Sequence, residues 1–158
     1  MTNQSNQNEA AIADLLQSDE QQLYAQLAVR TRAMTQNPSV AGSFAPDITT
    51  DVTQMGLGED LVQAGKRLFN RTVVQAYVLV CGHDPDDEAE RKNVRDAFGL
   101  GDVAITTALA GLFTAQLGLA PAVAGVVAAL ILKRFAPMAY NELCQVWEKN
   151  LPAEGDHS

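Results

Sequence analysis

A chain of 158 residues has the size of one domain and can bury about two-thirds of the surface that its unfolded form exposes. Its 19 acidic and 11 basic side chains give a net charge of −8, which repels phosphate backbones and disfavours nucleic-acid binding. Hydrophobic residues make up 47% of the chain but aromatic residues only 6%, a composition that favours closely packed helices over a broad aromatic-lined cleft.

The first helices are predicted from apolar spacing and from capping residues. Residues 1–8 are polar and lack the features of a cleaved signal peptide, so we expect a disordered tail there. Apolar residues then recur at helical spacing over residues 9–17. Ser18 and Gln21 have the spacing of a capping box and predict the start of a second helix. That helix ends before Pro38, which has no backbone N–H to donate.

Residues 37–58 are rich in Pro, Gly, Ser, Thr and Asp and predict a long irregular loop. Loops of this length are uncommon within a compact domain and are often functional or mobile. The loop is therefore a candidate contact surface. The alternative is a structural strap that crosses the bundle.

A long amphipathic helix is predicted over residues 59–81, because its apolar residues repeat at steps of three, four or seven. A buried strand over residues 72–80 is the alternative, but the sequence offers no matching second strand. Gly82 is expected to end the helix. The pair Asp84-Pro85 then predicts the start of another helix, which runs to Phe98.

The basic residues gather in two clusters that are each accompanied by carboxylates, and we interpret both as solvated helix faces. In the second cluster, carboxylates precede basic residues by four positions, the favourable order for ion pairs on a helix surface. The clusters are Lys66, Arg67 and Arg71, and then Arg91, Lys92 and Arg95; the expected pairs are Asp87 with Arg91 and Glu88 with Lys92.

The most distinctive feature is the absence of charge from Val103 to Leu132. Gly99 and Gly101 before this stretch, and Gly118 with Pro121 within it, predict a helical hairpin with arms at residues 103–117 and 121–135. We therefore predict an all-α protein in which a single compact bundle of about six helices surrounds this hairpin. The first arm would span roughly 24 Å and the uncharged part of the second about 18 Å, whereas a hydrocarbon core is about 30 Å thick.

Small residues recur along both arms of the hairpin and let helix backbones approach closely, in soluble cores as in membranes. We expect the two sets to face each other across the hairpin. The first set is Ala104, Ala108, Gly111 and Ala115, and the second is Gly125 and Ala129.

The densest group of reactive side chains contains Cys81, His83 and Asp84. Zinc sites need four ligands from two segments and calcium loops need spaced oxygens, and the sequence shows neither pattern. Helix capping accounts for the acidic residues, although metal binding by the three residues stays open. Cys81 and Cys144 are too few and too far apart for a disulfide framework, so we expect unpaired, inert cysteines in a reducing cytoplasm.

We predict a single helical domain over residues 9–151, followed by a disordered tail at 152–158, with no catalytic, cofactor-binding or metal-binding residue. The resulting hypothesis is a non-enzymatic helical interaction or assembly protein that binds a protein partner or associates with itself. The alternative is a membrane-active protein that releases residues 103–132 onto a bilayer. In kind, though without a shared motif, that hairpin looks like the hydrophobic hairpins of pore-forming bacterial toxins.

Overall fold

The computed structural model describes residues 2–46, 59–82, 85–135 and 139–151. These residues form seven α-helices and two short 3-10 helices, and they contain no strand, so the predicted all-α class is confirmed. The elements are α1 (Thr2–Gln17), α2 (Glu20–Gln36), η1 (Pro38–Gly42), α4 (Glu59–Cys81), η2 (Pro85–Asp87), α5 (Glu88–Ala97), α6 (Asp102–Leu117), α7 (Pro121–Phe135) and α8 (Tyr140–Lys149).

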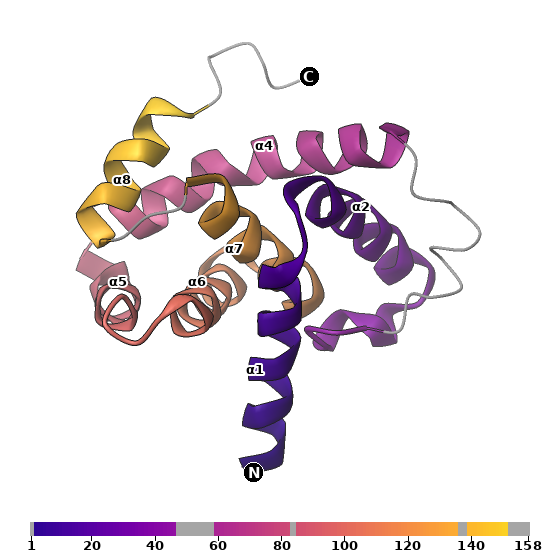
Figure 1. Cartoon of the computed structure of the whole chain (residues 1–158), viewed down its shortest axis with the longest axis horizontal. Coiled ribbons are helices and arrows are strands. Elements are labelled where there is room, and N and C mark those ends of the chain that lie inside the picture. Colours follow the sequence, from indigo (N-terminus) through magenta and orange to yellow (C-terminus); the bar gives the residue numbers. More distant parts are fainter. Residues whose placement is uncertain (1, 47–58, 83–84, 136–138, 152–158) are drawn as a thin grey trace.

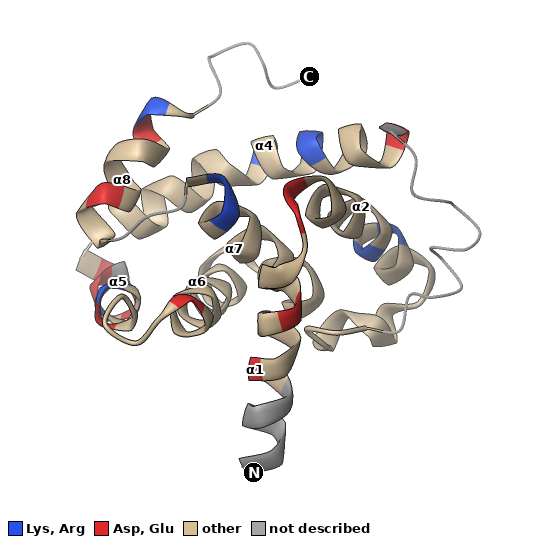
Figure 2. Ribbon diagram, viewed as in Figure 1, with Lys and Arg blue, Asp and Glu red and all other residues tan. Residues whose placement is uncertain are grey.

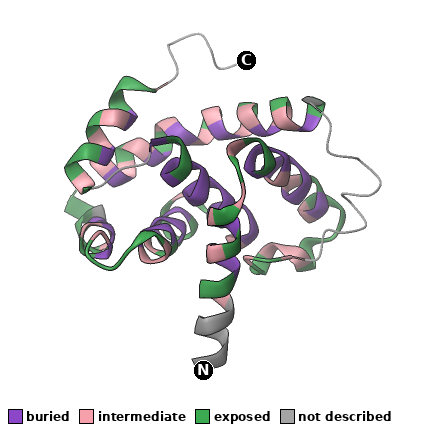
Figure 3. Cartoon of the chain, in the orientation of Figure 1, coloured by how far each residue is buried: buried purple, intermediate pink, exposed green. Residues whose placement is uncertain are grey.

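Helix α7 forms the centre of the bundle, as expected for the second arm of the hairpin. It packs against α1, α2, η1, α6 and α8, which surround it in Figure 1. Its only charged residues are Lys133 and Arg134 in the last turn, whereas most other charges lie on the surrounding helices (Figure 2). Twelve of its 15 residues are buried, and Figure 3 shows the helix almost entirely in the colour of buried residues.

The tight corner between the two arms forms as predicted. Gly118 caps α6 in the left-handed conformation with φ 70°, which is accessible to glycine at little cost. The N–H of Leu119 donates to the carbonyl of Phe113 at 3.4 Å, and α7 begins at Pro121. The corner thus has the local backbone conformation and the proline placement that the sequence predicts, and Leu117 and Leu119 beside Gly118 also pack against the core.

The start of α2 lies one residue later than the sequence predicted. Asp19, and not Ser18, is the N-cap, and its carboxylate accepts from the Gln22 N–H at 2.8 Å. The Gln22 side chain accepts in return from the Asp19 N–H at 3.0 Å, which completes the capping box. The Ser18 N–H donates instead to the Leu15 carbonyl at 3.1 Å, as part of the end of α1.

Helix α1 begins at Thr2, so residues 2–8 are helical where we expected a disordered tail. This stretch contains neither glycine nor proline. Three buried residues of α1, Ala11, Ile12 and Leu15, anchor the helix against the bundle. A helix that is already nucleated extends at little further cost, because each added residue gains a hydrogen bond. The predicted tail at 152–158 lies outside the described residues.

The described part of the predicted loop at 37–58 behaves as a strap. Residues 38–42 form η1, which packs against α2 and α7. Phe44 packs against the hydrophobic core, and its carbonyl accepts from the buried Arg30 side chain at 2.8 Å. Residues 47–58 lie outside the described residues, so the structure leaves their expected role as a contact surface a prediction.

Gly65 and Gly111 occupy opposite environments within helices. A Cβ added to Gly65 would overlap the backbone carbonyl of Tyr24, where α4 crosses α2. A Cβ added to Gly111 would meet nothing within 4 Å. Only Gly65 therefore permits a close approach of two helix backbones.

We predict opposite effects for alanine at these two glycines. Gly65→Ala should lower the free energy of unfolding by about 1–3 kcal/mol, because two helices must separate to admit the methyl group. Gly111→Ala should raise it by about 0.5–1 kcal/mol, because alanine has the higher helix propensity. Urea unfolding followed by circular dichroism measures both, and equal effects for the pair would contradict the packing described here.

Candidate functional site

The reactive cluster predicted around Cys81 is not assembled as a metal site in the described part of the chain. His83 and Asp84 lie outside the described residues, and Cys81 is bonded to another cysteine. No group of three or more His, Cys, Asp or Glu side chains comes together among the described residues.

Cys81 and Cys144 form a disulfide, so the expectation of two unpaired cysteines was wrong. They are separated by 63 positions in sequence, yet the end of α4 packs against α8 and brings their Cα atoms to 5.7 Å. The available signal was that each cysteine directly follows a core residue, Val80 or Leu143. The expected cytoplasmic location was inferred partly from unpaired cysteines; it loses that support and stays a prediction.

The disulfide lies at the wall of a surface pocket of about 360 Å³ between α4, α5 and α8. Both cysteines are half-buried, so the bond is neither enclosed in the core nor freely exposed. Charged and polar side chains from α5 and α8 complete the wall. The lining residues are Cys81, Gly82, Glu88, Arg91, Arg95, Tyr140, Asn141, Cys144 and Gln145.

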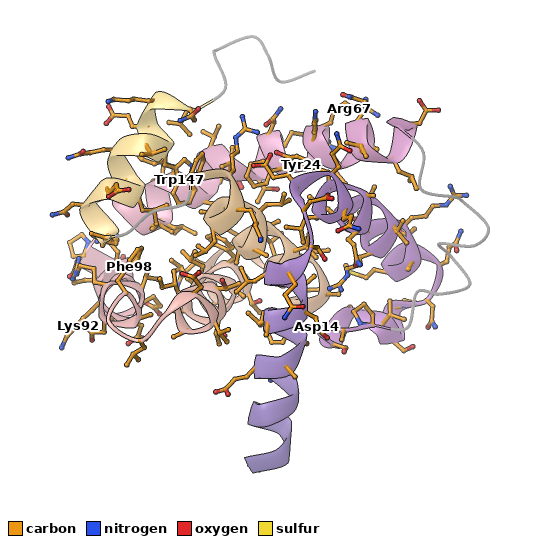
Figure 4. The ribbon with its side chains drawn as sticks, in the orientation of Figure 1. Asp14, Tyr24, Arg67, Lys92, Phe98 and Trp147 are labelled. Atoms are coloured by element: carbon orange, nitrogen blue, oxygen red, sulfur yellow. A yellow bond between two sulfur atoms is a disulfide. The ribbon has the colours of Figure 1, made fainter. Side chains whose placement is uncertain are left out.

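Arg91 is buried, with 2% of its surface exposed, which corrects its interpretation as part of a solvated face. Its Nε donates to the Leu79 carbonyl at 3.0 Å, near the C-terminal end of α4. Its Nη1 contacts Glu88 at 3.0 Å, and Glu88 also pairs with Arg95. Glu88 therefore bonds to residues three and seven positions on, whereas the expected partner, Lys92, points outward (Figure 4). The Asp87 side chain lies outside the described part of the structure.

Tyr140 connects the pocket to the interior. Its hydroxyl donates to the carbonyl of Val80, and the Arg95 guanidinium lies over its ring at 5.6 Å from the centroid. Burial raises the pKa of the Tyr140 hydroxyl, and the positive charges of Arg95 and Arg91 partly oppose that rise. The hydrogen bond to Arg95 is the largest cause that lowers the pKa of the Glu88 carboxyl.

A second and larger hollow, of about 660 Å³, lies between α1, α5 and α6. We call it the α5–α6 groove. At its edge is Leu100, which is 77% exposed and sits in the turn between Gly99 and Gly101. Gly101 has φ 105° and serves as the N-cap of α6, which begins at Asp102. The lining residues are Glu9, Asn93, Asp96, Ala97, Leu100, Val103, Ala104, Thr107 and Ala108.

The four small residues of α6 that were expected to face α7 lie instead in the groove or at the exposed surface. Gly111 and Ala115 are exposed, and Ala104 and Ala108 line the groove. The larger residues Ile105, Leu109, Leu112 and Phe113 form the buried face of α6, together with Thr106 and Ala110. Gly125 of α7 faces Ile12, Leu15 and Phe44, and not α6. Spacing alone predicted that the small residues share a face but could not predict which neighbour that face meets.

The groove has an apolar floor and an acidic edge. Of the residues that line it, Glu9 and Asp96 are acidic and none is basic. Helix α6 contributes no charge beyond Asp102 in its first turn, and Figure 2 shows the rest of this helix without charged residues. The hydroxyl of Thr107 donates to the Val103 carbonyl at 2.7 Å and is thereby used within the helix. The groove is therefore a hollow that exposes apolar surface and negative charge.

Arg30 of α2 is buried where α2 packs against α7, with 5% of its surface exposed. Its guanidinium donates to Gln26 Oε1 at 2.9 Å and to the carbonyls of Phe44 and Ala122 at 2.8 and 3.0 Å. Removal from water lowers the pKa of Arg30 to about 10. The side chain joins α2, α7 and the segment after η1.

Comparison with known protein families, with curated proteins and with solved structures found no match for this chain. In the described residues, no single helix is long and apolar enough to cross a membrane. By length and composition alone, α7 and α8 meet that criterion only as a pair that is bent by 87°.

We predict that the disulfide contributes strongly to stability. Closing a loop between residues 63 positions apart should destabilise the unfolded chain by about 4 kcal/mol on the chain-entropy account. Cys144→Ala should therefore lower the free energy of unfolding by about that amount, as measured in urea without reductant. With reductant present, wild type and variant should unfold at closely similar urea concentrations. A large difference that persists there would assign the effect to packing.

We also predict that the Arg30 hydrogen bonds are needed for stability. Arg30→Gln is too short to reach both carbonyls and should cost about 1–3 kcal/mol, because buried carbonyls lose a donor. Arg32→Gln changes the same charge at an exposed position of the same helix and should alter stability by no more than about 0.5 kcal/mol. Thermal unfolding of the two variants compares them directly.

Proposed function

We propose that this protein is a non-enzymatic helical interaction protein that binds an amphipathic, basic helix of a partner protein in the α5–α6 groove. The observation that carries the proposal is the groove itself, in which exposed Leu100 lies beside an uncharged helix face lined by small residues. Helix-in-groove recognition places apolar anchors of one helix into such a hollow.

The size and surface of the groove support a helix as the occupant. Ala104 and Ala108 have small side chains, so a second helix can approach the α6 backbone closely along this face. Leu100 and Val103 supply apolar area at one end. An exposed apolar residue is ordinary by itself, but one that borders an apolar hollow indicates a contact surface.

Charge favours a basic partner over a second copy of this chain. Glu9 and Asp96 border the groove, and the whole chain carries a net charge of −8. Two copies would therefore repel each other at long range, whereas a helix with Lys or Arg beside its apolar face would be attracted. Self-association, which the sequence left open, is the competing outcome of the experiment below.

Release of the hairpin onto a membrane stays a second prediction from the sequence. Its cost is set by α7, because the buried residues of that helix would have to leave the contacts they make with α1, α2, η1 and α8. Loss of that burial removes a large share of the apolar core on which a marginally stable domain depends, because α7 supplies 11 of the 35 buried hydrophobic residues in the described part of the chain. The groove proposal requires no such rearrangement, which is why we favour it.

We predict that a synthetic helical peptide of about 20 residues, with leucines on one face and lysines beside them, binds the protein. Leu100→Ala should weaken binding about tenfold, since the loss of one apolar anchor costs roughly 1.4 kcal/mol. Ala108→Glu should weaken binding further, because it places a side chain in the floor of the groove. Fluorescence anisotropy of the labelled peptide measures each dissociation constant.

The matched control is Val78→Ala, since Val78 is the other large exposed hydrophobic residue described and is 58% exposed on α4. It should leave the dissociation constant unchanged. A peptide with glutamates in place of the lysines should bind much more weakly. Equal binding of both peptides would contradict the proposal. So would a protein dimer in light scattering that Ala108→Glu dissociates, because that result would identify a second copy as the occupant.

A further inference from the structure

We propose that the Cys81–Cys144 disulfide is a thiol–disulfide exchange site for small thiols that carry negative charge. The proposal concerns the pocket between α4, α5 and α8, and it does not depend on the function proposed for the α5–α6 groove. It rests on the position of the disulfide, on the access that the pocket provides and on the charges that surround it.

Access comes from the pocket. Both cysteines line a hollow of about 360 Å³ and are half-buried, so a small molecule can reach the bond without unfolding of the domain. The neighbouring core residues Val80 and Leu143 are fully buried and hold the two backbones in place. A disulfide enclosed by such residues would be inert, whereas an exposed one is open to exchange.

The charges of the pocket favour an anionic thiol. The guanidinium groups of Arg91 and Arg95 come from α5, and the side chain of Arg95 is 38% exposed. Glu88 is the one carboxylate among the described residues that line the pocket, and it contacts both arginines. The lining thus carries a net positive charge on a protein whose overall charge is −8. The same guanidinium groups would stabilise the cysteine thiolate that leaves when the disulfide opens.

The exchange takes place in two steps. The thiolate of the small molecule attacks one cysteine sulfur, forms a mixed disulfide with it and expels the other cysteine as a thiolate, which takes up a proton from water. A second molecule of the small thiol attacks the sulfur of the first. That attack releases the oxidised small disulfide and the second cysteine thiolate. In total, two small thiols lose two electrons and become one small disulfide. The protein disulfide gains these electrons and becomes two thiols.

Reduction removes one of the attachments of α8. The helix keeps its buried Leu143 and Trp147, the latter in ring contact with Tyr77 and Phe135, and Figure 4 shows Trp147 directed into the interior. It also keeps the hydrogen bond from Tyr140 to Val80. We therefore expect the reduced protein to stay folded in the absence of denaturant, so that the exchange is reversible.

The test compares three small thiols that differ in charge: 2-mercaptoethanesulfonate, 2-mercaptoethanol and cysteamine. Each is added to the folded, oxidised protein at low ionic strength, and samples are quenched with acid. Intact mass measures the mixed disulfide and the reduced product, and rates are divided by the thiolate concentration. We expect the anionic thiol to react about tenfold faster than the neutral one and the cationic thiol to be slowest, with the differences shrinking as salt is added.

Variants separate the pocket from the rest of the protein. Arg95→Gln should remove most of the preference for the anionic thiol, and Arg95→Lys, which keeps the charge, should preserve it. Arg71→Gln changes the net charge equally at an exposed position of α4 that does not line the pocket, and it should leave the preference intact. Circular dichroism confirms that each variant is folded before its rate is compared.

Three results would overturn the proposal. One is the opposite order of rates, with the cationic thiol fastest, which the overall negative charge of the chain alone would produce. Another is a disulfide that none of the three thiols reduces unless denaturant is present, which would make the bond purely structural. A preference that survives Arg95→Gln at full strength would likewise contradict the assigned role of the pocket.

Discussion

The burial of α7 is the constraint on which the rest of the structure depends. Twelve of its 15 residues have no access to solvent or almost none, so the helix must be covered on every side. The amphipathic helices and the strap at η1 provide that cover. Most of the buried apolar residues join α7 in one large cluster, and a smaller second cluster lies between α2 and α4. The apolar residues of α7 are removed from water only when all the surrounding elements are packed around the helix. These elements should therefore fold together with α7.

Once α7 is covered, its hairpin partner is left with one free face. Six of the 16 residues of α6 are buried, and the opposite side of the helix carries alanines, threonines and Gly111 without charge. This asymmetry is the origin of the α5–α6 groove. It also changes the meaning of the uncharged stretch: one arm is the core, and the other is partly a surface.

Helix α5 borders both hollows. Glu88, Arg91 and Arg95 line the pocket at the disulfide, whereas Asn93, Asp96 and Ala97 line the groove, and Val94 between them is fully buried. Its two polar faces therefore differ in charge, with a positive side near the cysteines and a negative side near Leu100. Buried arginines hold segments in place at two sites, Arg91 beside α4 and Arg30 beside α7, and both do so by donating to backbone carbonyls.

The sequence alone determined the class of the fold, most helix boundaries and the corner at Gly118 and Pro121, because propensity, capping and proline geometry act within a few residues. At the start of α2 the sequence predicted Ser18 as the N-cap, one residue before the N-cap in the structure, Asp19. Only the tertiary structure decided that Cys81 meets Cys144 and that Arg91 is buried. It also decided that four small residues of α6 face the groove or solvent and not α7; they are Ala104, Ala108, Gly111 and Ala115. Those outcomes depend on which helix lies beside which, and apolar periodicity defines a buried face without defining what covers it.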